Sequence, residues 1–162
     1  MLNNKYSTGL VIGRFQPFHK GHEYLFEKAF EHCDKVIIGI GSANRHNKNN
    51  PWTARERRGF LMKFIENKRY EDKILRIINI DDHPDDDVWF ENLTKKTGPF
   101  DVTLGNNDWN NGIIERHGIK AIYTGIHNRE EFEGFKIRKL MREKKLWKQR
   151  VPTYLQDFIR SL

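Results

Sequence analysis

The sequence lacks the features of membrane and disulfide-bonded proteins. It has a single cysteine, Cys33, which excludes an intramolecular disulfide. No apolar run approaches the roughly 20 residues needed to cross a bilayer, and the first residues, MLNNKYST, lack the charged-then-apolar order of a signal peptide. We therefore expect a cytoplasmic protein with no membrane span. Cys33 falls in the apolar pattern of an expected first helix, which favours a buried small side chain over a nucleophile.

Acidic residues are fewer than basic ones. The chain has 22 Asp and Glu against 29 Lys and Arg, a formal net charge of +7, which favours an anionic partner such as a nucleotide or a nucleic acid. With 162 residues, 37% of them hydrophobic, the chain can bury one sizeable core but hardly a second. We therefore expect one domain over residues 1–162.

Short apolar runs alternate with amphipathic stretches, a pattern typical of a doubly wound, Rossmann-like α/β fold. We expect five parallel strands, at residues 9–13, 35–43, 74–80, 100–105 and 119–125. In such a sheet, ligands bind at the carboxyl ends of the strands.

Helices are expected between these runs. Apolar residues recur at helical spacing over 25–33 and 60–65. Thr53, followed three residues later by Glu56, indicates a capping box at the start of the second helix. A third helix is expected to contain VWFENLTKK, residues 88–96, and the aspartates before it are more typical of a helix cap than of a metal site. The polar segment 44–51 is expected to be an irregular loop.

The stretch GRFQPFHKGH, residues 13–22, lies where the first strand gives way to a helix. Gly13 allows a sharp turn, and Gly21 leaves room for a phosphate at the helix start. His19 and His22 lie three residues apart and can offer imidazole donors to one anion beside the helix dipole. The alternatives are a zinc pair, which would need further ligands at suitable spacing, and two incidental surface histidines.

GRFQPFHKGH resembles the signature of the archaeal-type nicotinamide mononucleotide adenylyltransferases, members of the nucleotidyltransferase superfamily that share His-x-Gly-His. Four later segments are similar to further blocks of the same family: GIGSANRHNKNNPWTARER, IDDHPDDDVW, LGNND and EGFKIRKLMREKKLWKQRVP. The resemblance implies the nucleotidyltransferase fold. It also implies transfer of AMP from ATP to the 5′-phosphate of nicotinamide mononucleotide, giving NAD and pyrophosphate.

The resemblance also implies roles for individual residues. The catalytic group would be His19, His22 and Arg57, with Arg57 contacting the ATP phosphates. ATP and its phosphates would be held by Gly13, Arg14, Phe15, Gln16, Gly21 and Arg138; Arg129 is a further candidate that we add as a hypothesis of our own. The mononucleotide would be bound by Gly41, Ser42, Asp82, Trp89, Gly105 and Asn106.

Trp89 would stack on the nicotinamide ring, since a cationic pyridinium over an indole is a favourable cation–π pair; from its helical pattern alone, Trp89 reads as a core residue. Mg²⁺ would enter with ATP, bridging phosphate oxygens and needing few protein ligands. No metal site of the protein itself is expected. The resemblance further implies a homo-oligomer.

The last block departs from the family pattern. Glu133 and Phe135 occupy positions where the family has serine and threonine, so two hydroxyl donors are missing. A carboxylate near ATP phosphates repels them, while Phe135 removes a donor from a helix start that otherwise suits anions. We expect Arg129 to compensate.

Other functions fit parts of this pattern. A related nucleotidyltransferase could use nicotinic acid mononucleotide, pantetheine phosphate or a flavin phosphate as the acceptor, and Trp89 argues against the last two. The changed segment at Glu133 and Phe135 also fits a protein that binds nucleotides without turnover. The basic run 136–150 fits a nucleic-acid-binding module, although its apolar residues at helical spacing are more typical of a helix with one packed and one solvated face.

Overall fold

A five-stranded parallel sheet forms the centre of the computed structural model, which describes residues 5–125 and 133–160. Its strands lie in the order β3-β2-β1-β4-β5. Their bounds are β1 Tyr6–Gly13, β2 Cys33–Ile40, β3 Ile74–Asn79, β4 Val102–Leu104 and β5 Lys120–Ile122. The five predicted strands are confirmed. The order reverses between β1 and β4, and ligands bind at this kind of switch point in open α/β sheets.

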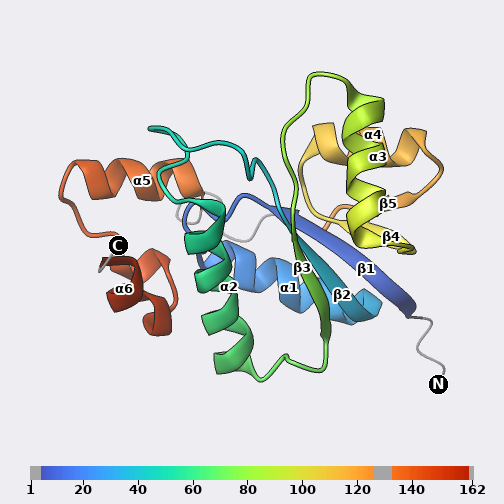
Figure 1. Ribbon diagram of the computed structural model, residues 1–162. Coiled ribbons are helices and arrows are strands. Elements are labelled where there is room, and N and C mark those ends of the chain that lie inside the picture. The colour runs from blue at the N-terminus through green and yellow to red at the C-terminus, as the bar shows by residue number, and fades with distance from the viewer. Residues whose placement is uncertain (1–4, 126–132, 161–162) are drawn as a thin grey trace.

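Helices cover both faces of the sheet (Figure 1). Helix α5 and helix α6 lie at the opposite end of the molecule from α3 and α4 (Figure 1). The bounds are α1 Lys20–His32, α2 Ala54–Lys68, α3 Asp86–Thr97, α4 Asp108–Arg116, α5 Gly134–Arg142, the 3₁₀ turn η1 Lys148–Arg150, and α6 Thr153–Arg160.

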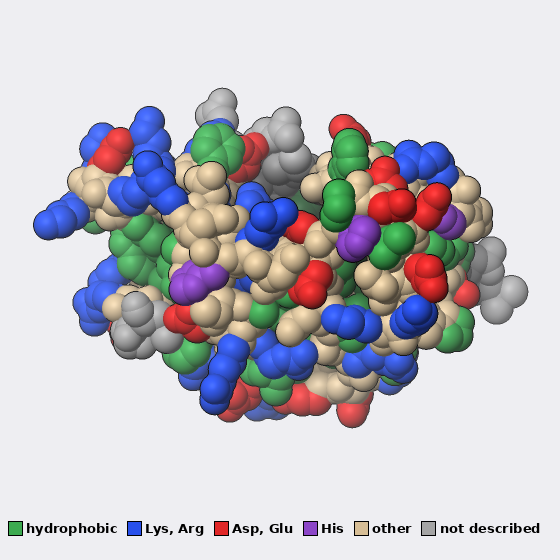
Figure 2. Space-filling model, turned by 45° about the horizontal axis from the view of Figure 1, so that its top comes forward, with side chains coloured by type: hydrophobic (Ala, Val, Ile, Leu, Met, Phe, Trp, Pro, Cys, Tyr) green, Lys and Arg blue, Asp and Glu red, His purple; other side chains and the backbone are tan. Residues whose placement is uncertain are grey.

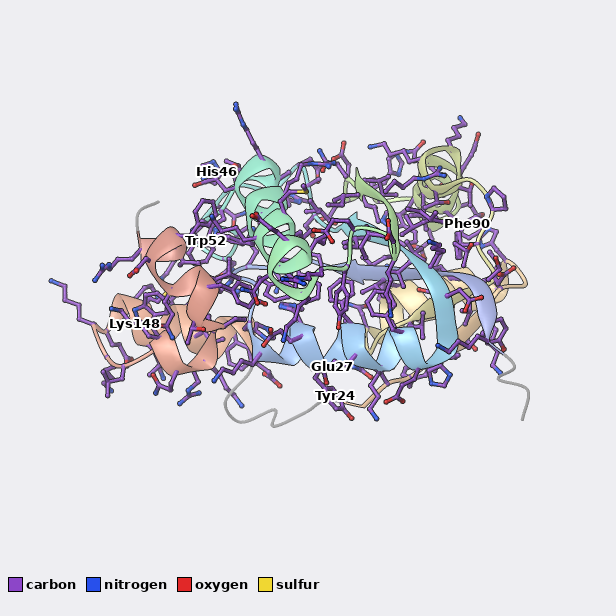
Figure 3. All side chains as sticks on the ribbon, turned by 90° about the horizontal axis from the view of Figure 1, so that it is seen from below. Tyr24, Glu27, His46, Trp52, Phe90 and Lys148 are labelled. Atoms are coloured by element: carbon purple, nitrogen blue, oxygen red, sulfur yellow. The ribbon has the colours of Figure 1, made fainter. Side chains whose placement is uncertain are left out.

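Alternation along the strands divides the buried side chains between two cores. On β1, Val11 packs against the face covered by α1, α2 and α6, whereas Leu10 packs against the face covered by α3 and α4. Aromatic rings dominate the first core, where the Phe26 and Phe64 ring centroids are 4.9 Å apart. The outer side of α1 carries Tyr24 and Glu27, which point away from the sheet (Figure 3).

Two helix starts are as predicted. The capping box of α2 is present, with the Thr53 hydroxyl accepting from the Glu56 amide at 3.1 Å. An Asp85 carboxylate oxygen caps α3 by accepting from the amides of Asp87 and Val88. Cys33 differs from its prediction, because α1 ends at His32 and Cys33 is the first residue of β2. It is nevertheless buried, and burial raises the pKa of its thiol to about 11.

The basic run 136–150 does not form one continuous helix. Helix α5 ends at Arg142, and Lys144 adopts a left-handed φ of 55°, which turns the chain before η1. As a result Leu146 is 81% exposed, so the packed face expected of this run is absent at that position. No helix among the described residues is long and apolar enough to span a bilayer.

Candidate active site

Two adjoining cavities open at the carboxyl ends of β1, β2 and β4. The α3–α4 cavity, about 390 Å³, lies between the ends of β1 and β2 and the helices α3 and α4. The α1–α5 cavity, about 430 Å³, lies between the starts of α1 and α5. They share a wall of four residues, Ile12, Gly13, Arg14 and Asn107. Two ligands bound in them would therefore meet at the end of β1.

His19 and His22 line the α1–α5 cavity, and the backbone fixes both rings. His19 Nδ1 accepts from the Gly21 amide at 3.1 Å, and His22 Nδ1 accepts from the His19 amide at 3.1 Å, so the two imidazoles form the capping box of α1. The rings stack with centroids 3.8 Å apart. Because each Nδ1 is an acceptor, a neutral ring carries its proton on Nε2.

Both imidazoles are neutral at physiological pH. Burial, with the charge of Arg138 adding to it, lowers the pKa of His19 to about 3. Burial and the neighbouring His19 lower the pKa of His22 well below its usual value. The pair therefore presents two Nε2–H donors to the α1–α5 cavity without the cost of desolvating two cations.

Arg14 is the cation shared by the two cavities. It is exposed, and its guanidinium is oriented by donation from Nη1 to Asn50 Oδ1 at 3.2 Å. Gly13 precedes it, and a Cβ at Gly13 would lie 2.8 Å from the Phe15 ring. The close packing of Phe15 under the turn is thus possible only with glycine at position 13.

Phe15 and Gln16, expected to bind ATP, do not line either cavity. Phe15 is buried with a φ of 55°, and its ring lies 4.7 Å from that of His22. The Gln16 amide group donates to the Trp52 carbonyl and accepts from the Trp52 amide. These two residues therefore shape the loop that carries the histidines.

Arg57, expected to contact the ATP phosphates, has backbone partners in this structure. The side chain is fully buried, and its guanidinium donates to the carbonyls of Thr53, Arg14, Gly41 and Ser42. Burial and the charge of Arg14 lower its pKa to about 10, so it stays charged at neutral pH. Four of its five N–H groups are directed at backbone carbonyls, so Arg57 holds the ends of β1 and β2 together.

Arg138 makes a similar contact from α5. Its Nη1 donates to the Gln16 carbonyl at 2.6 Å, and the side chain is 5% exposed. Burial, Arg14 and Arg142 lower its pKa to about 10. A Cβ at Gly134 would lie 2.9 Å from this Nη1, so glycine makes room for the guanidinium. Arg129, expected to assist here, lies outside the described residues.

The α3–α4 cavity contains four of the six residues expected to bind the mononucleotide: Gly41, Ser42, Asp82 and Trp89. The Asp82 carboxylate accepts from Ser42 Oγ at 2.9 Å and from Arg45 Nε at 3.1 Å. Trp89 is 7% exposed and packs in the second core while lining this cavity. It is therefore both a core residue and part of the site.

Gly105 and Asn106, the other two residues expected to bind the mononucleotide, do not line the α3–α4 cavity. Asn106 lines the α1–α5 cavity and not the one that contains Trp89. Its amide pairs with the backbone of Gly125, donating to the carbonyl at 2.9 Å and accepting from the amide at 3.0 Å. Gly105 lines neither cavity, and its carbonyl accepts from Asn111 Nδ2, which secures the start of α4.

Some lining residues were not predicted from the sequence. Asn107, Asn110 and Trp109 bring the first turn of α4 to the α3–α4 cavity. An asparagine-rich turn followed by an aromatic was the available signal, but α4 itself was not predicted. Glu133 and Phe135, noted as departures from the family pattern, both line the α1–α5 cavity. Among the described residues no group of three His, Cys, Asp or Glu side chains is placed to hold a metal.

Comparison with known proteins agrees with this architecture. Residues 10–161 match the family model described as cytidylyltransferase-like. Nicotinamide-nucleotide adenylyltransferase from Archaeoglobus fulgidus is 33% identical over 155 residues, covering 93% of this chain and 89% of the relative. The enzyme of that name from Methanolobus tindarius is 36% identical over 152 residues, covering 91% and 84%.

A solved structure shares the fold. A bifunctional NMN adenylyltransferase/ADP ribose pyrophosphatase from Francisella tularensis superposes with a TM-score of 0.84 at 23% identity, covering 96% of this chain and 49% of that one. A second structure of a Francisella tularensis protein of the same description, complexed with AMP and a manganese ion, gives a TM-score of 0.74 at 22% identity, covering 97% of this chain and 50% of that one.

Proposed function

The chain belongs to the nicotinamide-nucleotide adenylyltransferase family, within the cytidylyltransferase-like proteins, and we propose that it transfers AMP from ATP to the 5′-phosphate of nicotinamide mononucleotide. NAD and pyrophosphate are the products. The observation that carries this proposal is the His19–His22 pair, two neutral donors fixed by backbone at a helix start and beside the cation Arg14.

The reaction needs alignment and charge stabilisation more than a protein nucleophile. An oxygen of the mononucleotide 5′-phosphate attacks the α-phosphorus of ATP in line. The bond from that phosphorus to the oxygen bridging to the β-phosphate breaks, and its electrons leave with pyrophosphate. Negative charge grows on the α-phosphoryl and leaving oxygens, where preorganised donors lower the barrier most.

We place ATP in the α1–α5 cavity and the mononucleotide in the α3–α4 cavity. The Nε2–H groups of His19 and His22 then face the triphosphate, and Arg14, at the shared wall, faces the α-phosphate where the two substrates meet. Basic side chains gather at the α5 end of the molecule, whereas acidic ones are frequent over α3 and α4 (Figure 2). This distribution favours the more anionic substrate on the α5 side.

Arg57 and Arg138 act here as positioning residues. Arg57 joins the carbonyl of Arg14 to those of Gly41 and Ser42, and Arg138 holds the carbonyl of Gln16. Both contacts lie directly behind the loop that carries the imidazoles. Their contribution to catalysis is the geometry of that loop.

Mg²⁺ belongs to the substrate in this proposal, entering bound to the ATP phosphates. The Francisella tularensis structure with AMP and manganese supports use of a divalent ion by the fold. We further propose that the protein works in the cytoplasm and as a homo-oligomer. Size-exclusion chromatography with light scattering tests the oligomeric state, and a monomeric mass would contradict the proposed homo-oligomer.

The deciding experiment measures NAD formation from ATP, Mg²⁺ and nicotinamide mononucleotide, beside nicotinic acid mononucleotide as the competing acceptor. We expect turnover with nicotinamide mononucleotide that is lost in the His22→Ala variant. Turnover only with nicotinic acid mononucleotide would reassign the acceptor.

A second candidate is a protein that binds both nucleotides without turnover. Glu133 and Phe135 favour it, because they place a carboxylate and an apolar ring at the wall of the proposed triphosphate cavity. Calorimetric binding of NAD without any pyrophosphate release from the substrates would support this candidate over the enzyme.

A further inference from the structure

Trp109 is a large aromatic side chain left in solvent at the edge of a cavity. It is 69% exposed and lines the α3–α4 cavity together with Trp89 of α3. Within the described residues, no hydrogen bond, ion pair or ring contact holds the Trp109 indole. Exposing the apolar surface of a tryptophan to water is unfavourable, and an exposed tryptophan next to a concave site is typical of a ligand contact.

The backbone of Trp109 is fixed although its side chain is not packed. Asn107 caps α4 by accepting from the Asn110 amide at 3.0 Å, and buried Asn111 donates to the Gly105 carbonyl at 3.1 Å. The first turn of α4 therefore stands at a defined place over the cavity. A side chain carried on such a turn loses little backbone entropy when it binds.

Helix α3, which carries Trp89, is tied to α4. Phe90, labelled in Figure 3, stacks on His117 with ring centroids 3.9 Å apart and an interplanar angle of 10°. Arg116 Nη2 lies 3.1 Å from Asp86 Oδ2. These contacts fix the position of α3 relative to α4, and hence the separation of the backbone positions of Trp89 and Trp109.

We propose that Trp109 is a specificity-determining residue that closes over the pyridinium ring of the acceptor, so that the ring is held between Trp89 on the inner side and Trp109 on the solvent side. This inference rests on the proposed function, because it takes the acceptor to occupy the α3–α4 cavity. The matching ligand is a flat cationic heteroaromatic ring, which pairs favourably with an indole face. The carboxylate of Asp82 in the same cavity suits that positive charge.

The test compares Trp109→Ala and Trp109→Phe with Leu146→Ala, a truncation of an exposed apolar residue that does not line either cavity. Trp109→Ala is expected to raise the KM for nicotinamide mononucleotide about tenfold, with the KM for ATP unchanged. Trp109→Phe should have a KM for nicotinamide mononucleotide close to that of the parent, and Leu146→Ala should have the same KM as the parent. Because Trp109 is exposed, the variants should keep the parent melting temperature.

Binding of reduced nicotinamide mononucleotide distinguishes two roles for Trp109, stacking on a cationic ring and simple closure of the cavity. The dihydropyridine ring of the reduced form is neutral and not aromatic. We expect Trp109→Ala to change its affinity less than twofold. An equal loss for both forms of the acceptor would overturn the cation-stacking role.

A binding readout does not depend on turnover. Nicotinamide mononucleotide should quench indole emission in the parent, and Trp109→Phe should remove a large part of that quenching. Suppose that the parent binds the mononucleotide, that Trp109→Ala has the same KM as the parent, and that Trp109→Phe shows the same quenching as the parent. This inference alone is then overturned. If the parent neither binds nor adenylylates the mononucleotide, the proposed function fails and the inference with it.

Discussion

The proposed active site has two regions that differ in how firmly they are held. The inner wall, made of the loop 14–19 with Arg57 and Arg138 behind it, consists of groups that hydrogen-bond to one another or to backbone. The rim, made of Trp109, Glu133 and Phe135, is attached to helix starts and is more open to solvent. We therefore expect substitutions in the inner wall to change both turnover and stability, and substitutions at the rim to change affinity alone.

The largest effect is expected from Arg57→Met. The substitution keeps an unbranched apolar stem but removes four hydrogen bonds to backbone carbonyls. The carbonyls of Thr53 and Ser42 keep a backbone amide donor, whereas those of Arg14 and Gly41 lose the guanidinium that binds them. Losing buried charge-assisted hydrogen bonds should lower the free energy of unfolding by about 3 kcal/mol and lower kcat as the loop shifts. Urea unfolding measures the free energy of unfolding, and NAD formation measures kcat. Arg55→Met, an exposed arginine in the same helix, is the control; equal stability of the two variants would contradict the role given to Arg57.

His22→Ala should lower kcat by about a hundredfold or more, since it removes one preorganised donor and the acceptor for the His19 amide. Steady-state turnover measures the loss, with circular dichroism to establish folding. His32→Ala, at the other end of the same helix, should retain full turnover. Full turnover in His22→Ala would remove the imidazole from the catalytic group.

Acid should destabilise the inner wall through His19. The folded pKa of about 3 lies below the unfolded value of 6.5, so the unfolded chain binds more protons as pH falls below 6.5. Stability conferred by the neutral ring is therefore complete above pH 6.5 and is lost as pH falls toward 3. At pH 5 the loss from this group is about 2 kcal/mol.

The measurement is urea unfolding at pH 7 and pH 5 in the parent and in His19→Asn. The difference between the two pH values should be smaller in the variant. An unchanged difference would mean that protonation of other groups governs acid stability.

The smallest effect is expected at the rim. Glu133→Ser removes a carboxylate from the wall of the α1–α5 cavity and should lower the KM for ATP about threefold to tenfold, less so at high salt. Stability should stay within about 0.5 kcal/mol, as for most surface substitutions. Glu143→Ser, at the other end of α5, is the control. A raised KM in Glu133→Ser would show that the carboxylate assists ATP binding.

Sequence patterns predicted the sheet well because β-strands buried on both faces appear as continuous apolar runs. They also predicted the cap at Thr53 and a cap from the aspartates before α3, since a cap depends on side chains within one turn. The end of α5 was not predicted, because apolar residues at helical spacing continue past Arg142 while a single left-handed residue, Lys144, stops the helix.

The sequence by itself determined the fold class, the family and the two histidines at the start of α1, because these depend on local periodicity and on a motif contained within ten residues. Only the tertiary structure decided which residues line the two cavities. Arg57 and Arg138 meet carbonyls of a loop far away in the chain, and Trp109 meets the cavity of Trp89 through the packing of α3 on α4. Side-chain direction depends on packing partners distant in sequence, and no local pattern encodes them.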